Sequence, residues 1–366
     1  MRVKLEDVCE RGSSNIKQSD IIKMSGNYPI YGASGLAGKV NFYHQEQPYV
    51  AVVKDGAGIG RTTLNPAKSS VIGTMQYLIP KKNVLPEYLF YAVSYMHLEK
   101  YYTGATIPHI YFKDYKNEEF NLDNIEKQLE IIDVLGRCKK VIEARKQELV
   151  ELDRLMKARF VEMFGTLDTP TQAFEKATLK ELCNKITDGK HGGCKSEVGT
   201  ERYFVGAREI YDDDVHYELA PEINIEEFEK DYKRCNVEIG DFLIVNTGAT
   251  IGKSAIACDK RTEHTLLQKS VALLKVKKDV LNPIFLKWCY RVNTKMYMVE
   301  NASAQPNLLL SKINATVIYV PDIELQNQFA DFVHQVDKSK FDTMTFAPIY
   351  AIINLYLHTY FYQGRR

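Results

Sequence analysis

An internal repeat constrains this chain more than any other feature. The stretch VVKDGAGIG at residues 52–60 returns as IVNTGATIG at residues 244–252, and other segments return in the same order. Because chance similarities do not keep a common order along a whole chain, the sequence predicts a duplicated structural unit. The other matches are LEDVC (5–9) with LKELC (179–183), KKNVLPEYLFYAV (81–93) with KKDVLNPIFLKWC (277–289), TIPHI (106–110) with AQPNL (304–308), and NIEKQLEIIDVL (124–135) with ELQNQFADFVHQV (324–336).

Each copy predicts the same α+β arrangement. Short runs of β-branched and aromatic residues, separated by Gly, Asn and Asp, favour strands. A helix is expected to start at Pro86 and at Pro283, since proline is tolerated in the first helical turn. A proline-containing loop, one more strand and a long helix follow, and the long helices are aligned at Gln128 and Gln328. The second copy is longer, and its extra residues are assigned to loops such as the charged stretch 211–232.

The clearest helix in the sequence runs from Ile125 to Phe164, a stretch without proline and with a single glycine, Gly136. A helix of this length spans about 60 Å. Its apolar residues recur by sevens, which is typical of a seam that packs against a second helix. The sequence therefore predicts two similar α+β domains on a helical spacer. The seam residues are Leu135, Ile142, Leu149, Met156 and Met163.

Composition limits the class of protein without selecting a partner. A chain of 366 residues is long enough for two domains of ordinary size. The formal net charge of +1 neither indicates nor excludes a nucleic-acid partner. The 7 cysteines form no CxxC pair and the N-terminus has no apolar signal segment, so reduced thiols and a cytoplasmic location are predicted. KHGGC (190–194) has no second pair of ligands, so no metal site is predicted.

Motifs that resemble catalytic sites do not meet the requirements of their chemistry. GATIGKS (248–254) is one residue short of a nucleotide-binding P-loop, and SAIAC after it favours a strand where a P-loop needs a helix. NPIF (282–285) resembles a methyltransferase loop, but no glycine-rich cofactor loop accompanies it. The acidic and basic residues of EEFEKDYK (226–233) favour a solvated loop over a nuclease site. A strand–turn–strand with glycines in unusual backbone conformations explains both copies of the glycine stretch.

A chain that repeats one fold around a spacer, without a catalytic constellation, is typical of a reader of two-part sites. Polar residues near the two glycine turns include types that contact DNA phosphates or base edges, with Arg and Lys suited to guanine and Asn and Gln to adenine. The candidate DNA-binding residues are Lys54, Arg61, Thr62, Lys190, His191, Arg208, Asn246, Thr247, Lys253, Ser254 and Gln268.

The chain resembles the specificity (S) subunits of type I restriction-modification systems over about residues 1–341. No single motif carries the resemblance, which depends on the order of the motifs and on their duplication. The matching stretches are YPIYGASGLAGKVNFY (28–43), VAVVKDGAGIG (50–60), ITDGKHGG (186–193), FLIVNTGATIGK (242–253), AQPNL (304–308), and the glutamine-containing helix starts IEKQLEII (125–132) and ELQNQF (324–329).

The resemblance implies a fold, a set of partners and a division of labour. Each α+β half is expected to be a target recognition domain that reads one half of a split double-stranded DNA site. The two long helices are expected to form an antiparallel, coiled-coil-like spacer that docks modification subunits. Those subunits would supply adenine methylation with S-adenosylmethionine, and restriction subunits would add ATP- and Mg-dependent cleavage. The chain itself is expected to be non-catalytic and to hold no cofactor.

The C-terminal segment departs from the resemblance. The helical pattern stops near Phe341, whereas the second helix of the family is usually as long as the first. The apolar run 347–362 contains Pro348, Asn354 and His358 and is shorter than the ~20 residues that span a bilayer, so no membrane partner is expected. Our hypothesis is that a rearrangement replaced the distal helix. The predicted boundaries are 1–122 and 166–321 for the two domains, 123–165 for the spacer helix, 322–341 for the start of the second helix, and 342–366 for the tail.

Two alternatives stay open at the level of sequence. One is a remnant whose altered C-terminus prevents assembly with modification subunits. The other is a stand-alone enzyme such as a fused methyltransferase or nuclease, which would require a cofactor loop or a metal-binding cluster of carboxylates.

Overall fold

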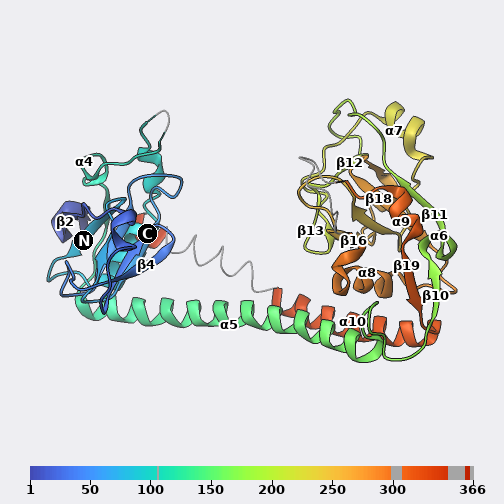
Figure 1. Cartoon of the computed structure of the whole chain (residues 1–366). Coiled ribbons are helices and arrows are strands. Elements are labelled where there is room, and N and C mark those ends of the chain that lie inside the picture. The colour runs from blue at the N-terminus through green and yellow to red at the C-terminus, as the bar shows by residue number, and fades with distance from the viewer. Residues whose placement is uncertain (105–106, 298–306, 345–358, 363–366) are drawn as a thin grey trace. The chain divides into compact units, whose positions relative to one another are not determined.

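The computed structural model describes residues 1–104, 107–297, 307–344 and 359–362 (Figure 1). The chain folds into two compact units. The first unit comprises Met1–Gln147 with Thr343–Arg366, and the second comprises Glu148–Asp342. Each unit therefore includes part of the predicted spacer helix as well as a predicted domain.

The first unit contains a four-stranded antiparallel sheet in the order β2-β8-β5-β6 and a three-stranded sheet in the order β4-β3-β7. In the smaller sheet β3 is parallel to β7. Strand β1 pairs with β9, and α3 packs on the larger sheet. The elements are β1 (Arg2–Lys4), α1 (Leu5–Val8), β2 (Cys9–Ser13), α2 (Gln18–Ile21), β3 (Tyr28–Gly32), β4 (Gly35–Val40), β5 (Tyr49–Val53), β6 (Thr62–Asn65), β7 (Ser70–Val71), β8 (Met75–Pro80), α3 (Pro86–Ser94), η1 (Leu98–Tyr101), α4 (Phe112–Tyr115) and β9 (Glu119–Asn121).

The second unit repeats this plan with the sheet order β11-β18-β15-β16. Strand β12 is parallel to β17, as β3 is to β7, and β10 pairs with β19, as β1 does with β9. The elements are β10 (Glu175–Thr178), α6 (Leu179–Leu182), β11 (Cys183–Asp188), β12 (Tyr203–Val205), β13 (Ile210–Tyr211), β14 (Asp214–Val215), α7 (Ile225–Tyr232), β15 (Phe242–Val245), β16 (Ser254–Ile256), η2 (Thr262–His264), β17 (Thr265–Leu267), β18 (Val271–Val276), α8 (Pro283–Val292), η3 (Thr294–Met296), α9 (Leu310–Ala315) and β19 (Val317–Val320).

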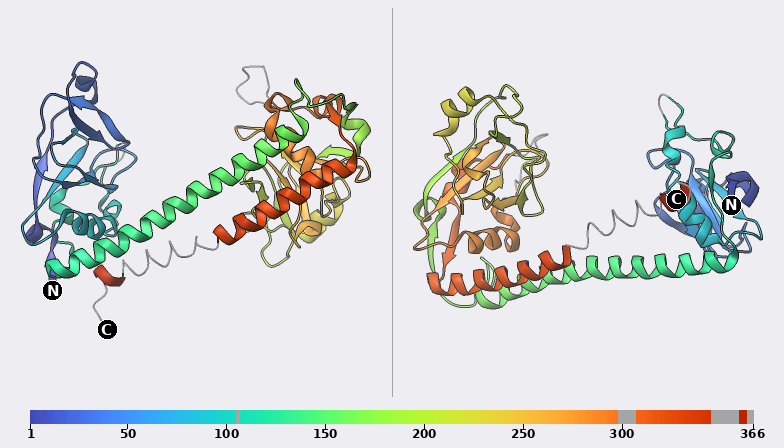
Figure 2. Two further views of the ribbon diagram at one scale, coloured as in Figure 1. Left: turned by 90° about the horizontal axis from the view of Figure 1, so that it is seen from below. Right: turned by 180° about the vertical axis from the view of Figure 1, so that it is seen from behind.

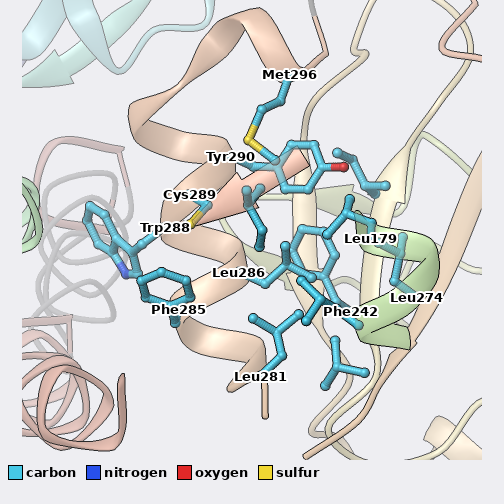
Figure 3. Packing of buried hydrophobic residues seen from close by; sticks show 14 of the residues in the cluster. Leu179, Phe242, Leu274, Leu281, Phe285, Leu286, Trp288, Cys289, Tyr290 and Met296 are labelled. Carbon is cyan, nitrogen blue, oxygen red and sulfur yellow. The ribbon is translucent and has the colours of Figure 1, made fainter. Parts of the chain in front are cut away.

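The core of the second unit lies on both sides of α8 (Figure 3). Phe242, on β15, stacks against Tyr290 with ring centroids 5.5 Å apart. On the other side of α8, Phe285 and Trp288 meet the long helices, with Trp288 5.9 Å from the ring of Phe329. The first unit buries the corresponding face of α3, which confirms the predicted duplication and both helix starts.

A buried glutamine identifies which residues correspond at the start of the two long helices. Gln128 accepts a hydrogen bond from the Leu85 amide (2.8 Å) and donates to the carbonyls of Asn83 and Asp123. Gln326 accepts from the Asn282 amide (2.9 Å) and donates to the carbonyls of Val280 and Pro321. Gln328 is exposed, so the predicted match of Gln128 with Gln328 is wrong. Two glutamines lie close together in ELQNQF, and only the tertiary contacts distinguish them.

The charged stretch 211–232 is not a solvated loop. It contains β14 and the helix α7, which begins after Asn224, whose side chain accepts a hydrogen bond from the Glu227 amide. Phe228 lies on the buried side of this helix, and its ring centroid is 4.8 Å from that of Tyr232. The two aromatic residues give α7 an apolar side, which the many charges around them obscure in the sequence.

The two long helices are α5 (Ile125–Phe164) and α10 (Ile323–Met344). Within the second unit α10 lies beside the last part of α5 (Figure 2). Phe160 of α5 meets Phe329, with ring centroids 5.2 Å apart, and Asp153 pairs with Lys340. The earlier residue of α5 (Asp153) meets the later residue of α10 (Lys340), and the later residue of α5 (Phe160) meets the earlier one (Phe329). The two helices are therefore antiparallel.

The residues predicted to form one seam on α5 do not share one core. Leu135 is buried in the core of the first unit, whereas Met156 is buried in that of the second, with Met163 packed against the same core. Ile142 and Leu149 are half-buried. The repeat by sevens therefore marks a face of α5 that packs against each domain core in turn, and within the described residues its last part meets α10.

Part of the C-terminal segment belongs to the first domain. Phe361 is 0% exposed, and its ring lies 5.2 Å from Tyr88 and 6.5 Å from Phe120. Pro348, Asn354 and His358 lie outside the described residues, so the predictions made on them stay untested. Among the residues that the structure does describe, no helix is long and apolar enough to cross a membrane.

Candidate nucleic-acid interface

The two glycine stretches are tight turns between antiparallel strands, as predicted. They join β5 to β6 and β15 to β16. The Gly60 amide donates to the Val53 carbonyl (2.9 Å), and the Gly252 amide donates to the Val245 carbonyl (3.0 Å). These glycines have φ angles of +82° and +90°, in the left-handed region that side chains disfavour. A strand follows each turn where a P-loop would have a helix.

A second loop is bonded to each glycine turn. The Ile110 amide donates to the Lys54 carbonyl (2.9 Å), and the Leu308 amide donates to the Asn246 carbonyl (2.7 Å). Asp55 and His109 form an isolated β-bridge, as do Thr247 and Asn307. The predicted proline loops, described from residue 107 in the first domain and from residue 307 in the second, therefore lie against the glycine turns.

Two further loops occupy equivalent places in the domains. The Gly73 amide donates to the Ile16 carbonyl (2.8 Å), and the Lys269 amide donates to the Lys190 carbonyl (2.9 Å). The Ile72 amide donates to the Tyr31 carbonyl (2.9 Å), and the Gln268 amide donates to the Val205 carbonyl (2.8 Å). These bonds align Lys17 with His191 and Ser34 with Arg208.

The aligned backbones carry different polar side chains. A shared backbone with unlike side chains is the arrangement expected of two sites that read different sequences. The pairs that differ are Lys17 with His191, Ser34 with Arg208, Lys54 with Asn246, Asp55 with Thr247, and His109 with Asn307, whereas Arg61 with Lys253 and Thr62 with Ser254 keep similar chemistry.

Three of the aligned residues of the first domain line one hollow, whereas Lys54, Arg61 and Thr62 are not among its lining residues. The hollow has a volume of about 520 Å³, and Lys17, Ser34 and Asp55 are among the residues that line it. Arg61 is exposed and donates to the Ala33 carbonyl (3.1 Å), whereas the Thr62 hydroxyl is bonded to the Gly60 carbonyl (3.2 Å). Burial, and then the charge of Arg11, lower the pKa of Lys54.

In the second domain some candidates are exposed and others are buried. Arg208 and Lys253 are exposed, so their charged ends are open to solvent. Asn246 and Ser254 are buried, at 3% and 5% exposure. Gln268 is half-buried and accepts a hydrogen bond from Ser270 (3.0 Å), while the Thr247 hydroxyl donates to Asn307 (3.2 Å).

Lys190 and His191 are engaged with acidic neighbours. The Lys190 ammonium lies 2.6 Å from Asp231 and 3.4 Å from Glu227, both on α7, and the bond to Asp231 is the main cause that raises its pKa. His191 is exposed and lies 3.6 Å from Asp188. In the described parts of the chain no group of three or more His, Cys, Asp or Glu is placed to hold a metal ion.

The structure adds positions to the candidate set that were not singled out from the sequence. These are Lys17, Ser34, Asp55, His109 and Asn307. For His109 and Asn307 the repeat contains the signal, because TIPHI (106–110) matches AQPNL (304–308) in the sequence. The missing information was that their loops fold against the glycine turns.

Comparison with known proteins identifies the family. The model of the type I restriction modification DNA specificity domain matches residues 1–154 and again residues 172–349. The crystal structure of a type I restriction-modification S subunit from M. genitalium is similar, with a TM-score of 0.61 and 16% identity, covering 98% of this chain and 95% of that one. A structure described as explaining complex assembly and conformational transition of the type I system matches with a TM-score of 0.51 and 15% identity, covering 98% and 94%.

No curated protein matches the chain in sequence. The two family matches together cover most of its length, and each falls on one copy of the repeat. The chain therefore belongs to the family of type I restriction-modification DNA specificity subunits, and its two recognition domains confer DNA sequence specificity.

Proposed function

We propose that each domain reads one half of a split double-stranded DNA site through the loops around its glycine turn. The observation that carries this proposal is the common hydrogen-bonded backbone with unlike side chains, such as Lys54 and Ser34 in the first domain against Asn246 and Arg208 in the second. A catalytic cradle would keep its chemistry the same in both copies. A reader of two different half-sites would not.

The chain acts in this proposal as the non-catalytic partner of modification and restriction subunits. Support for docking on the spacer comes from apolar side chains of α5 that are exposed among the described residues, since exposed apolar surface is available to a partner. S-adenosylmethionine, ATP and Mg would be held by the partner subunits. The exposed large apolar residues of α5 are Ile125, Leu129, Val134, Val141, Val150, Leu155 and Val161.

The test of half-site reading uses one variant in each domain. The chain is co-expressed with modification subunits, and binding is measured at fixed salt on sites in which one half is randomised. Arg61→Ala is expected to weaken selection at one half-site and Lys253→Ala at the other. Loss of selection at both halves from either variant would contradict the proposal.

Matched controls are available at the opposite ends of the same sheets. Lys82 and Lys278 are exposed and follow β8 and β18, away from the turns. Lys82→Ala and Lys278→Ala are expected to leave selection unchanged. Co-purification with the modification subunits tests assembly separately, and failure to form a complex would favour the remnant over the working subunit.

A further inference from the structure

One pair of side chains in each domain joins the glycine turn to the proline loop. In the first domain Nδ1 of His109 contacts the Asp55 carboxylate. In the second domain the Thr247 hydroxyl donates to the Asn307 carboxamide oxygen at 3.2 Å. Each pair occupies an isolated β-bridge at the same place in the repeat.

The first pair joins an imidazole to a carboxylate. Burial, and then the nearby Lys54 ammonium, lower the pKa of His109 from its ordinary value. An ionised carboxylate can only accept hydrogen bonds, so Nδ1 of the His109 imidazole is the donor in this contact and Asp55 is the acceptor. The ring is held from its other side as well, since its centroid lies 4.0 Å from that of Tyr111.

The second pair performs the same connection with uncharged groups. The hydroxyl of Thr247 is within 3.4 Å of Asn246 and 3.2 Å of Asn307, so this hydrogen bond lies beside two candidate DNA contacts. In both domains the members of the pair direct polar groups at each other. Groups already engaged in this way position a neighbouring loop better than they read a base.

We propose that Asp55–His109 and Thr247–Asn307 are positioning pairs that hold the glycine turns in the conformation that contacts DNA, and that the two pairs are interchangeable. This inference rests on the proposed reading of half-sites by the glycine turns. It assigns specificity to the residues next to the pairs, such as Lys54 and Asn246, and assigns loop geometry to the pairs themselves.

The first readout does not involve DNA. Amide hydrogen exchange at Ile110 reports the bond to the Lys54 carbonyl, which joins the two loops. His109→Ala and Asp55→Ala are each expected to speed this exchange about tenfold, the effect of losing one ordinary hydrogen bond. The double exchange D55T/H109N, which transfers the pair of the second domain, is expected to restore protection to within about twofold.

The second readout is DNA binding with each half-site randomised in turn. The single variants are expected to weaken binding at the half-site of the first domain about five- to tenfold, and the double exchange to recover both affinity and sequence preference. Lys82→Ala is the control, since Lys82 is exposed and follows β8 at the end of the sheet away from the glycine turn.

Two results would overturn the inference. One is unchanged exchange at Ile110 in both single variants. The other is a double exchange that restores protection but alters the preferred half-site, because the pair would then read bases itself. An unmodified chain that shows no half-site preference would contradict the proposed function instead, while the exchange measurement would still decide whether the pairs fix the loops.

Discussion

The two recognition domains complete their cores with aromatic residues from different parts of the chain. In the second domain these residues come from the end of α5, where Phe164 packs 4.9 Å from the ring of Phe285. In the first domain Phe361 packs 5.2 Å from the ring of Tyr88. Tyr88 and Phe285 occupy the same position in α3 and α8, so Phe361 takes the role of the α5 phenylalanines.

The repeated unit therefore extends beyond the matched sequence segments. Its second copy begins within α5, and the corresponding piece of the first copy lies at the other end of the sequence. Hydrogen bonds fix that piece: the Asn121 side chain donates to the Tyr360 carbonyl (2.7 Å), and the Tyr362 hydroxyl donates to the Ala92 carbonyl (2.6 Å). The second domain completes its core with the end of α5, which leads directly into it. The first domain completes its core with residues 360–362, which are distant in the sequence.

The largest effect is expected from Phe164→Ala. This side chain is fully buried among Phe160, Phe285 and Phe329. Removing a buried phenyl ring leaves a cavity and costs about 3–5 kcal/mol. Amide exchange resolved by domain should show this loss in the second domain while the first keeps its free energy of unfolding. An equal loss in both domains would show that their cores are not independent.

Phe361→Ala is expected to destabilise the first domain by about 2–4 kcal/mol. The loss is smaller than for Phe164 because a released tail regains conformational entropy, which offsets part of the cavity term. Leu129→Ala is the control, since Leu129 is an exposed apolar residue on α5. Unchanged protection of β9 and α3 in Phe361→Ala would contradict the assignment of the tail to this core.

Gln128→Leu and Gln326→Leu test whether the two helix anchors are equivalent. Each substitution leaves buried backbone groups without partners, at about 1–3 kcal/mol. We expect similar losses, each confined to its own domain, when denaturant unfolding is followed by domain-resolved exchange. Gln328→Leu provides the matched control on an exposed position and should change little. A large effect at Gln328 would restore the alignment predicted from the sequence.

The smallest effect concerns pH. Burial raises the pKa of Asp153, but hydrogen bonds and charges from Lys340 and Arg291 outweigh it and lower the pKa below its ordinary value. Because the folded-state pKa is lowered, the stabilisation is complete above the ordinary carboxyl value of about 4 and is lost as the pH falls through the lowered value. Thermal unfolding of the second domain should lose this acid sensitivity in Asp153→Asn. Equal acid sensitivity in that variant would contradict the role of the carboxylate.

Local patterns predicted the elements of the fold, and distant contacts decided the rest. The helix starts at Pro86 and Pro283 and the bounds of α5 follow from signals within each segment. Helix α7 was missed because charges surround its apolar side, and the docking of Phe361 was missed because its partners lie far away in the sequence. The sevenfold periodicity of α5 predicts which of its residues are covered, but it does not indicate whether a domain core or α10 covers them.

The candidate site shows the same division. The glycine turns and the matched TIPHI and AQPNL segments were found from the repeat, whereas their contact was not. Lys190 is a candidate DNA contact in the sequence, but its acidic partners come from α7, which the sequence did not predict. Asp55 and His109 lie far apart in the sequence and come into contact only because the glycine turn and the proline loop fold together. The DNA contacts themselves stay a prediction.

A chain that reads two half-sites through two domains on one spacer must be sensitive to the distance between those half-sites. The decisive measurement is the affinity of the complex for sites that keep both half-sequences and differ only in the length of the gap, at matched salt. We predict one preferred gap, with affinity falling when base pairs are inserted or removed. Equal affinity for all gap lengths would contradict the proposed reading of a split site.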